Sequence, residues 1–195
     1  MIQCPATAGY DWWAMAHRPL RIDPIAEARR HWEDRWDEGA SMAAATSIMR
    51  AQQIVQSQVD EALRPHQLTF ARYEALVLLS FTRTGSLPMG KMGERLMIHP
   101  TSVTNIVDRL EAQGLVRRLP HDRDRRTTLV EITDEGRQLV QTATKDVVVG
   151  RFGLEFLSTD ELDQLTGLLR KLRLGALDFV PDGHVPPRQG YGVRT

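Results

Sequence analysis

The most suggestive spacing for chemistry is a pair of glycines followed by a lysine, in the segment TRTGSLPMGKM at 83–93. Gly85, four further residues, Gly90 and the lysine match the phosphate-binding loop of nucleotide hydrolases, but Met92 stands where that loop needs a Ser or Thr for Mg²⁺. The loop also needs a strand before it and further parallel strands. The preceding segment at 68–81 contains LVLLSF, which could form a buried strand, but its Ala and Glu residues favour a helix. We therefore expect a helix there and no nucleotide hydrolysis.

A second set of polar side chains lies on one face of the helix predicted over 100–113. Val103, Ile106, Val107 and Leu110 recur with helical spacing and form the buried stripe. The opposite face begins with hydroxyl and amide side chains, which are short enough to enter a major groove about 12 Å wide and hydrogen-bond base edges. An ordinary solvated face is the alternative, but such faces favour Glu and Lys. The residues predicted to contact bases are Thr101, Ser102, Thr104 and Asn105, with Arg109 contacting a phosphate or a base.

The segment after Gly114 predicts a β-hairpin with a basic turn, because the alternating runs LVRRL and TTLVEI flank PHDRDRR. Arg123, Arg125 and Arg126 lie at the turn, and arginine fits the narrow, electronegative minor groove of DNA. Asp124 is predicted to pair with a neighbouring arginine and hold the turn in shape. Residues 86–126 carry eight Lys or Arg against five Asp or Glu, whereas the whole chain carries 25 of each. Positive charge is therefore concentrated where this helix and hairpin lie, although a plain solvated turn remains the alternative.

The composition of the 195-residue chain is that of a soluble globular protein, with 42% apolar and 26% charged residues. Its single cysteine, Cys4, excludes an intrachain disulfide and makes the reducing cytosol the default compartment. No apolar run has the length of a signal peptide or a membrane span. The six histidines show no ligand-pair spacing and no nucleophile lies in a recognisable catalytic set, so we expect no metal, no cofactor and no enzymatic activity.

The remaining elements are expected to be helices. Asp23 and Pro24 begin a helix that Gly39 bends or breaks. Thr69 is expected to cap the next helix, with an inner face of Phe70, Tyr73, Val77 and Phe81. Gly90 and Gly93 are expected to let a short helix approach its neighbour closely, because they lack a β-carbon. The predicted organisation is a flexible arm at 1–22, dimerisation helices at 23–66, a DNA-binding lobe at 67–136, dimerisation helices at 137–179 and a disordered tail at 180–195.

The segments LTFARYEALVLL and MGERLMIHPTSVTNIVDRLEAQGLVRRLPHDRDRRTTLVEITDEG resemble the winged helix-turn-helix of the MarR (multiple antibiotic resistance regulator) family. The most specific part is Asp-Arg-Arg at 124–126, followed by an alternating strand and Thr133-x-x-Gly136. The resemblance covers about 25–178, with its hallmark at 67–136. It implies a mainly α fold with a small β-hairpin wing and long N- and C-terminal helices that interlock two subunits.

The resemblance also implies a function. We expect a cytoplasmic, nucleoid-associated transcriptional repressor that binds a near-palindromic double-stranded operator as a homodimer with half-sites about 10 bp apart. The independent reason to expect a dimer is that long amphipathic helices without a covering sheet would otherwise expose large apolar patches. The rival hypothesis is a protein- or ligand-binding module with a degenerate winged helix that does not bind DNA.

The family further implies a pocket for a small aromatic or anionic effector. Trp32, Trp36, Glu74 and Arg118 resemble the set used by the urate-responsive branch, which has a Trp, an Asp and an Arg at comparable places. Glu74 stands here in place of the Asp. Both tryptophans could instead be core residues.

Overall fold

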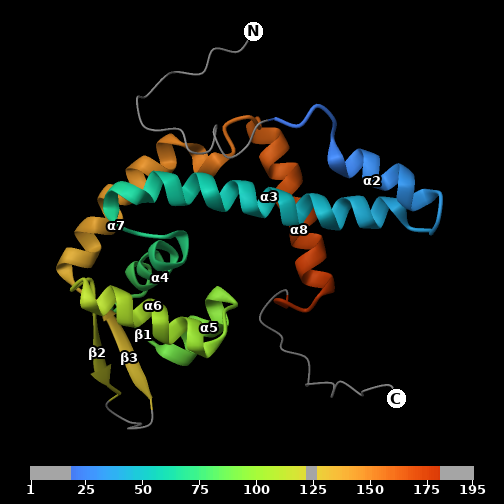
Figure 1. The fold of residues 1–195 in the computed structure, drawn as a ribbon. Helices are drawn as coiled ribbons and strands as arrows, with labels where there is room; N and C mark the ends of the chain where they lie inside the picture. The colour runs from blue at the N-terminus through green and yellow to red at the C-terminus, as the bar shows by residue number, and fades with distance from the viewer. Residues whose placement is uncertain (1–18, 122–126, 181–195) are drawn as a thin grey trace, which may run out of the picture. The chain divides into compact units, whose positions relative to one another are not determined.

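The computed structural model describes residues 19–121 and 127–180, and the chain divides into two compact units, the first ending at Ser57 and the second beginning at Gln58 (Figure 1). Within the described ranges there are seven α-helices and one small antiparallel sheet. This confirms the predicted mainly α architecture with a β-hairpin. The arginine-rich turn at 122–126 lies outside the described residues.

The first unit consists of helix α2 (Pro24–Glu33) and most of helix α3 (Gly39–Leu63). The carboxylate of Asp23 accepts a hydrogen bond from the backbone N–H of Ile25 at 2.9 Å, which satisfies one of the free amides at the start of α2. The expected break at Gly39 is confirmed, because α3 begins at this glycine after a short connection.

Helix α4 (Phe70–Ser80) confirms that the apolar run at 76–81 is helical and not a strand. Its buried residues are Tyr73, Ala75, Leu76 and Leu79. Only Tyr73 of the expected inner face is buried. Phe70 and Val77 are half-buried, and Phe81 lies beyond the end of the helix with its side chain 82% exposed.

The start of α4 also differs from the expectation. Thr69 occupies the cap position, but its hydroxyl makes no capping hydrogen bond. Asp60, from the end of α3, instead accepts a hydrogen bond from the backbone N–H of Phe70 at 2.5 Å. The cap is therefore supplied across space by a residue ten positions earlier, which local sequence signals do not reveal.

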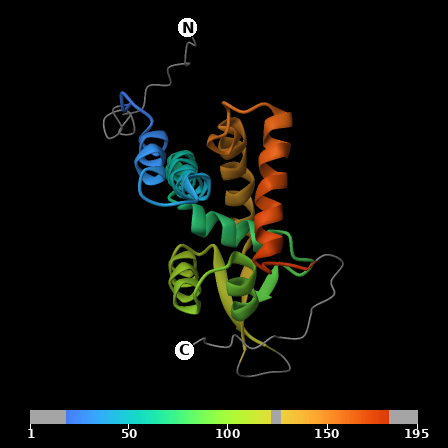
Figure 2. The ribbon, with the colours of Figure 1, turned by 90° about the vertical axis from the view of Figure 1, so that its right-hand side faces the viewer.

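The sheet contains strands β1 (Ser86–Pro88), β2 (Val116–Pro120) and β3 (Thr128–Ile132), in the order β1-β3-β2. The β2–β3 pairing is the predicted hairpin, and both views show it extending beyond the helices beside it (Figures 1 and 2). The third strand was not predicted, because three residues are too few to show a period. Gly85, just before β1, has a φ of 70°, which suits glycine.

Helices α5 (Met89–Leu96) and α6 (Pro100–Ala112) form the helix-turn-helix, joined through Met97, which has a left-handed φ of 54°. A β-carbon on Gly93 would lie 3.2 Å from the Val103 side chain, so this glycine does permit the close approach of the two helices. The same expectation for Gly90 was wrong, since nothing lies within 4 Å of a β-carbon built there.

Helix α7 (Asp134–Val149) follows β3 directly, and its first turn is capped by the hydroxyl of Thr133, which accepts from the N–H of Gly136 at 3.0 Å. A β-carbon on Gly136 would lie 2.2 Å from the carbonyl oxygen of Leu115, so only glycine fits at this contact. The Tyr73 hydroxyl meets the Thr144 hydroxyl at 3.0 Å and joins α4 to α7.

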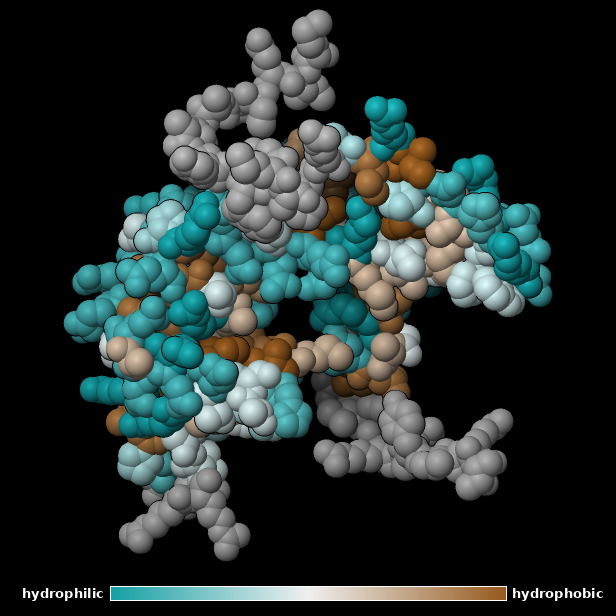
Figure 3. Space-filling view, viewed as in Figure 1, coloured by the Kyte–Doolittle hydropathy of each residue, from teal (hydrophilic) through white to brown (hydrophobic). Residues whose placement is uncertain are grey.

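A short 3-10 turn, η2 (Arg151–Gly153), leads to helix α8 (Thr159–Gly175), which begins with a capping box between Ser158 and Glu161. Three leucines on α8 are exposed: Leu165 by 38%, Leu168 by 69% and Leu172 by 58%. The space-filling view shows hydrophobic surface near the C-terminal end of this helix (Figure 3). Within the second unit, α8 therefore leaves an apolar face uncovered.

Candidate nucleic-acid interface

The local sequence around α6 determines where this helix begins and ends. Pro100 occupies the first turn, and the Nδ1 atom of His99 accepts from the backbone N–H of Thr101 at 3.3 Å. Gly114, with a φ of 73°, ends the helix and leads into β2. Of the predicted buried stripe, Val103, Val107 and Leu110 are buried, whereas Ile106 is only half-buried.

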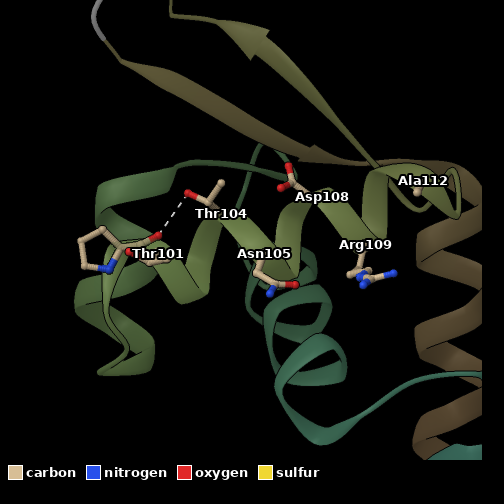
Figure 4. A pocket seen from close by; sticks show the side chains of 7 residues that line it. Thr101, Thr104, Asn105, Asp108, Arg109 and Ala112 are labelled. Carbon is tan, nitrogen blue, oxygen red and sulfur yellow. Dashed lines mark hydrogen bonds between the residues drawn. The ribbon is translucent and has the colours of Figure 1, made fainter.

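The opposite face of α6 is an open depression of about 740 Å³ (Figure 4). This surface, which we call the α6 face, brings together four of the five residues predicted for the recognition helix. Ser102 is also exposed but does not line the depression. The α6 face is lined by Pro100, Thr101, Thr104, Asn105, Asp108, Arg109 and Ala112.

Some polar side chains of the α6 face already form hydrogen bonds within the protein, and others do not. The Thr104 hydroxyl donates to the carbonyl oxygen of Pro100 at 3.1 Å, and the Thr101 hydroxyl lies 3.1 Å from His99 Nδ1. Asn105 and Arg109 make no side-chain hydrogen bond or ion pair to any described residue. Their amide and guanidinium groups are the ones available to hydrogen-bond with base edges or phosphates.

A second depression, of about 310 Å³, lies between the start of α4 and α6, and its lining shares Asn105 and Arg109 with the α6 face. Arg72 also lines it, and its Nε atom donates to the Thr69 hydroxyl at 3.3 Å. Two guanidinium groups and no carboxylate thus line one depression, which favours an anion such as a phosphate. Sequence analysis missed Arg72, because α4 shows only core-forming periodicity and nothing in it points to α6.

The two strands of the hairpin pair up to the residues that flank the segment 122–126. Leu119 pairs with Leu129 and Pro120 with Thr128. The predicted wing residues, Arg123, Asp124, Arg125 and Arg126, lie outside the described residues.

Arg118, predicted for an effector pocket, lies on β2 and reaches back to α6. Its guanidinium forms ion pairs with Asp108 through Nη2 and with Glu111 through Nη1. Partial burial alone would lower the pKa of Arg118, but the hydrogen bonds and charges of the two carboxylates outweigh burial and raise this pKa. Asp108 and Glu111 were not singled out as functional residues in the sequence.

The other residues predicted for the effector pocket fall in both units. Trp32 and Trp36 belong to the first unit, with ring centroids 4.9 Å apart, and the Trp32 indole N–H donates to the Asp37 carbonyl at 2.8 Å. Trp36 is 59% exposed, so it is no core residue of the described chain. Glu74 belongs to the second unit, on α4.

Glu74 is half-buried and forms no ion pair or side-chain hydrogen bond with the residues that the structure describes. Burial raises its pKa, because the charged form loses hydration without gaining a partner. The second unit does not pair Glu74 with Arg118, whose guanidinium is occupied by the α6 carboxylates.

The described ranges contain no group of three or more His, Cys, Asp or Glu residues that could hold a metal ion. None of their helices combines the length and the hydrophobicity that a membrane span requires.

Comparison with known proteins agrees with this geometry. The family model described as "MarR family" matches residues 68–128, from just before α4 to the start of β3. The repressor MdtR of Bacillus subtilis is 30% identical over 132 residues, which span 67% of this chain and 83% of MdtR. The family match includes the complete helix-turn-helix of α5 and α6.

Solved structures extend the similarity to most of the fold. Sco5413, a MarR family transcriptional regulator from Streptomyces coelicolor, is 54% identical with a TM-score of 0.68, over 72% of this chain and 97% of Sco5413. Sco3205 from the same organism, solved in complex with DNA, is 25% identical with a TM-score of 0.66, over 73% of this chain and 91% of Sco3205. The chain therefore belongs to the MarR family of transcriptional regulators.

Proposed function

We propose that this protein is a homodimeric repressor that binds a near-palindromic double-stranded DNA operator and is released from it by a small aromatic or anionic effector. The observation that carries the proposal is the α6 face, where Asn105 and Arg109 present uncommitted hydrogen-bonding groups on a helix whose other face is buried. Thr101, Ser102 and Thr104 would add hydroxyl groups to the same contact with base edges.

The hairpin would act beside α6. Arg123, Arg125 and Arg126 would contact the minor groove or the backbone, and Asp124 would hold the turn. Arg72 and Arg109 would bind a phosphate next to the groove, since both line one depression without a carboxylate. The relative Sco3205, which has the same fold, was solved in complex with DNA, and this supports a DNA-binding function.

The proposed dimer would use the segments at 23–66 and 137–179, and residues 67–136 would form the DNA-binding lobe. The uncovered leucines of α8 support the dimer, because water-exposed apolar area favours association. Two copies related by two-fold symmetry would read two half-sites about one helical turn apart. The protein would then work in the cytoplasm, associated with the nucleoid.

The proposed effector site rests on the family resemblance and on Trp32, Trp36 and Glu74. A neutral Glu74 can donate a hydrogen bond, and burial moves this carboxyl toward its neutral form. Arg118 is the least suited of the four predicted residues to bind an effector, because its guanidinium already pairs with two carboxylates of α6. A thermal-shift screen of aromatic acids and purines tests the effector. An increase in the unfolding temperature with one of these ligands, and release of DNA by the same ligand, is the expected result.

The DNA-binding function is tested by sequencing genomic fragments that the purified protein retains. We expect enrichment of a near-palindrome with half-sites about 10 bp apart, and affinity that falls steeply with salt because phosphate contacts release counterions. Retention of no sequence above background, from a correctly folded protein, would favour the rival hypothesis of a winged module that binds only protein or small molecules.

A further inference from the structure

Arg118 connects the hairpin to the recognition helix through both its side chain and its backbone. Its guanidinium pairs with Asp108 on one nitrogen and with Glu111 on the other. The other oxygen of Glu111 accepts from the backbone N–H of Arg118 at 2.9 Å. Glu111 is thus held twice by one residue of β2, and Asp108 once. We call this arrangement the Arg118 clamp.

The neighbouring arginine shows that this connection is specific to one face of the strand. Arg117 pairs with Glu131 on β3, within the hairpin, and forms no ion pair with the described residues of α6. The Arg117 side chain is 64% exposed, whereas that of Arg118 is 28% exposed. Adjacent strand residues point to opposite faces, so only Arg118 faces α6. Charge-assisted hydrogen bonds to a planar guanidinium are directional, which fixes orientation as well as distance.

The position of Asp108 links the clamp to the α6 face. Asp108 lines the same depression as Asn105 and Arg109, on the edge nearest the hairpin (Figure 4). A carboxylate at that place would repel DNA phosphates if it stood alone. Its pairing with Arg118 neutralises the charge and at the same time ties α6 to the strand that leads to the arginine-rich turn.

We propose that Arg118 is a positioning residue for DNA binding: it holds α6 and the β2–β3 hairpin at a fixed angle, so that both elements meet one duplex without rearrangement. This inference rests on the proposed DNA-binding function. Its physical basis is preorganisation, because two elements that are already aligned lose less conformational freedom when they bind. Arg118 itself need not touch DNA.

For the neutralisation of a carboxylate, the clamp and simple electrostatics predict opposite changes in DNA affinity. Replacing a carboxylate near DNA by a neutral amide removes repulsion and should tighten binding if the carboxylate has no other role. If the clamp positions α6, then Asp108→Asn and Glu111→Gln weaken binding despite the loss of a negative charge. We expect each variant to bind the operator about tenfold more weakly, in the range of measured coupling between residues in contact.

The experiment compares Asp108→Asn, Glu111→Gln, Arg118→Gln and Arg118→Lys by fluorescence anisotropy with a retained operator over a series of salt concentrations. Arg117→Gln and Glu131→Gln are the matched controls, since this ion pair lies within the hairpin and does not reach α6. We expect the controls to bind within about twofold of the wild type, as expected for an exposed pair. Arg118→Lys should recover only part of the affinity, because an ammonium cannot replace the planar fork.

The salt dependence separates positioning from direct contact. If Arg118 only positions α6, the salt slope, which is the slope of log affinity against log salt concentration, is the same for Arg118→Gln and the wild type. A phosphate contact would lower the slope by about one. That lower slope, together with unchanged binding of Asp108→Asn and Glu111→Gln, would overturn the proposal.

Binding of the two carboxylate variants as tight as the wild type, or tighter, would also overturn it. Thermal unfolding is followed in parallel. If Arg118→Gln does not fold, Asp108→Asn decides the question, because the Asp108 side chain is 57% exposed and tolerates a neutral replacement. A wild-type protein that retains no DNA would instead contradict the proposed function itself, and the role of the clamp with it.

Discussion

Helices α6 and α8 each leave one face uncovered in the second unit, but the two faces have opposite chemistry. The α6 face is built from hydroxyl, amide and guanidinium groups around Asn105 and Arg109. The exposed face of α8 carries Leu165, Leu168 and Leu172. A polar face with uncommitted donors suits a hydrogen-bonding partner such as a DNA groove, whereas a leucine face suits an apolar protein surface. One chain therefore presents two surfaces, which we expect to bind different kinds of partner.

The largest effect is expected from placing charge on the α8 face. We predict that the double variant Leu168→Glu and Leu172→Glu dissociates the proposed dimer, because each leucine buried there would contribute about 1.5–3 kcal/mol and a buried glutamate would add a penalty. Analytical ultracentrifugation measures the change. Lys171→Glu, an exposed position on the same helix, is the control for added negative charge. If the double variant keeps the oligomeric state of the wild type, the α8 leucines do not form the interface between subunits.

The next effect concerns the basic turn. We predict that Arg125→Ala weakens binding about tenfold on many DNA sequences and lowers the salt slope by about one, because it removes a cation but no base-specific contact. Titrations of operator and unrelated DNA at several salt concentrations test this prediction. A loss confined to the operator would contradict it.

A smaller effect, but a more specific one, is expected on the α6 face. We predict that Asn105→Ala costs about 1 kcal/mol, or about fivefold in operator affinity, and relaxes the preference at a single base position. Selection of binding sites from a random DNA library, with wild type and variant in parallel, shows which positions lose preference. Equal loss at every position would mean that Asn105 contacts the backbone or only supports the helix.

The smallest effect is expected at Glu74. The α8 leucines are apolar and exposed, whereas Glu74 is polar, half-buried and without a partner among the described residues. Its pKa in the folded protein lies above the ordinary value of 4.5, so the folded state binds the proton more tightly than the unfolded state does. The contribution of Glu74 to stability therefore falls as the pH rises from about 4.5 through its folded pKa, and is constant above it. We predict that Glu74→Gln stabilises the protein at pH 7 but not at pH 4.

Urea unfolding at the two pH values measures this difference. Glu155→Gln, at an exposed position, is the matched control and should change stability equally little at both. A Glu74→Gln variant that is destabilised at pH 7 would show that the carboxylate has a stabilising partner, such as the second subunit.

Periodicity and cap signals predicted the elements of the lobe well where the information is local. The ends of α6, at His99 and Gly114, and its buried valines all follow from short sequence patterns. The errors occurred where a neighbour in space decides. Phe81 matched the helical spacing, but the helix ends one residue before it, and Gly90 has the same lack of a β-carbon as Gly93 without a neighbour close enough to need it.

The amino-acid sequence by itself determined that 100–113 is an amphipathic helix and that a hairpin follows, because helix and strand periods are properties of adjacent residues. The tertiary structure alone decided which charged groups meet across these elements. Arg118 lies ten residues after Asp108 and seven after Glu111, and only the turn at Gly114 brings the strand back alongside the helix. Likewise, Asp60 caps α4 only because the end of α3 lies beside it. Such contacts depend on the path of the backbone through space, which no local pattern encodes.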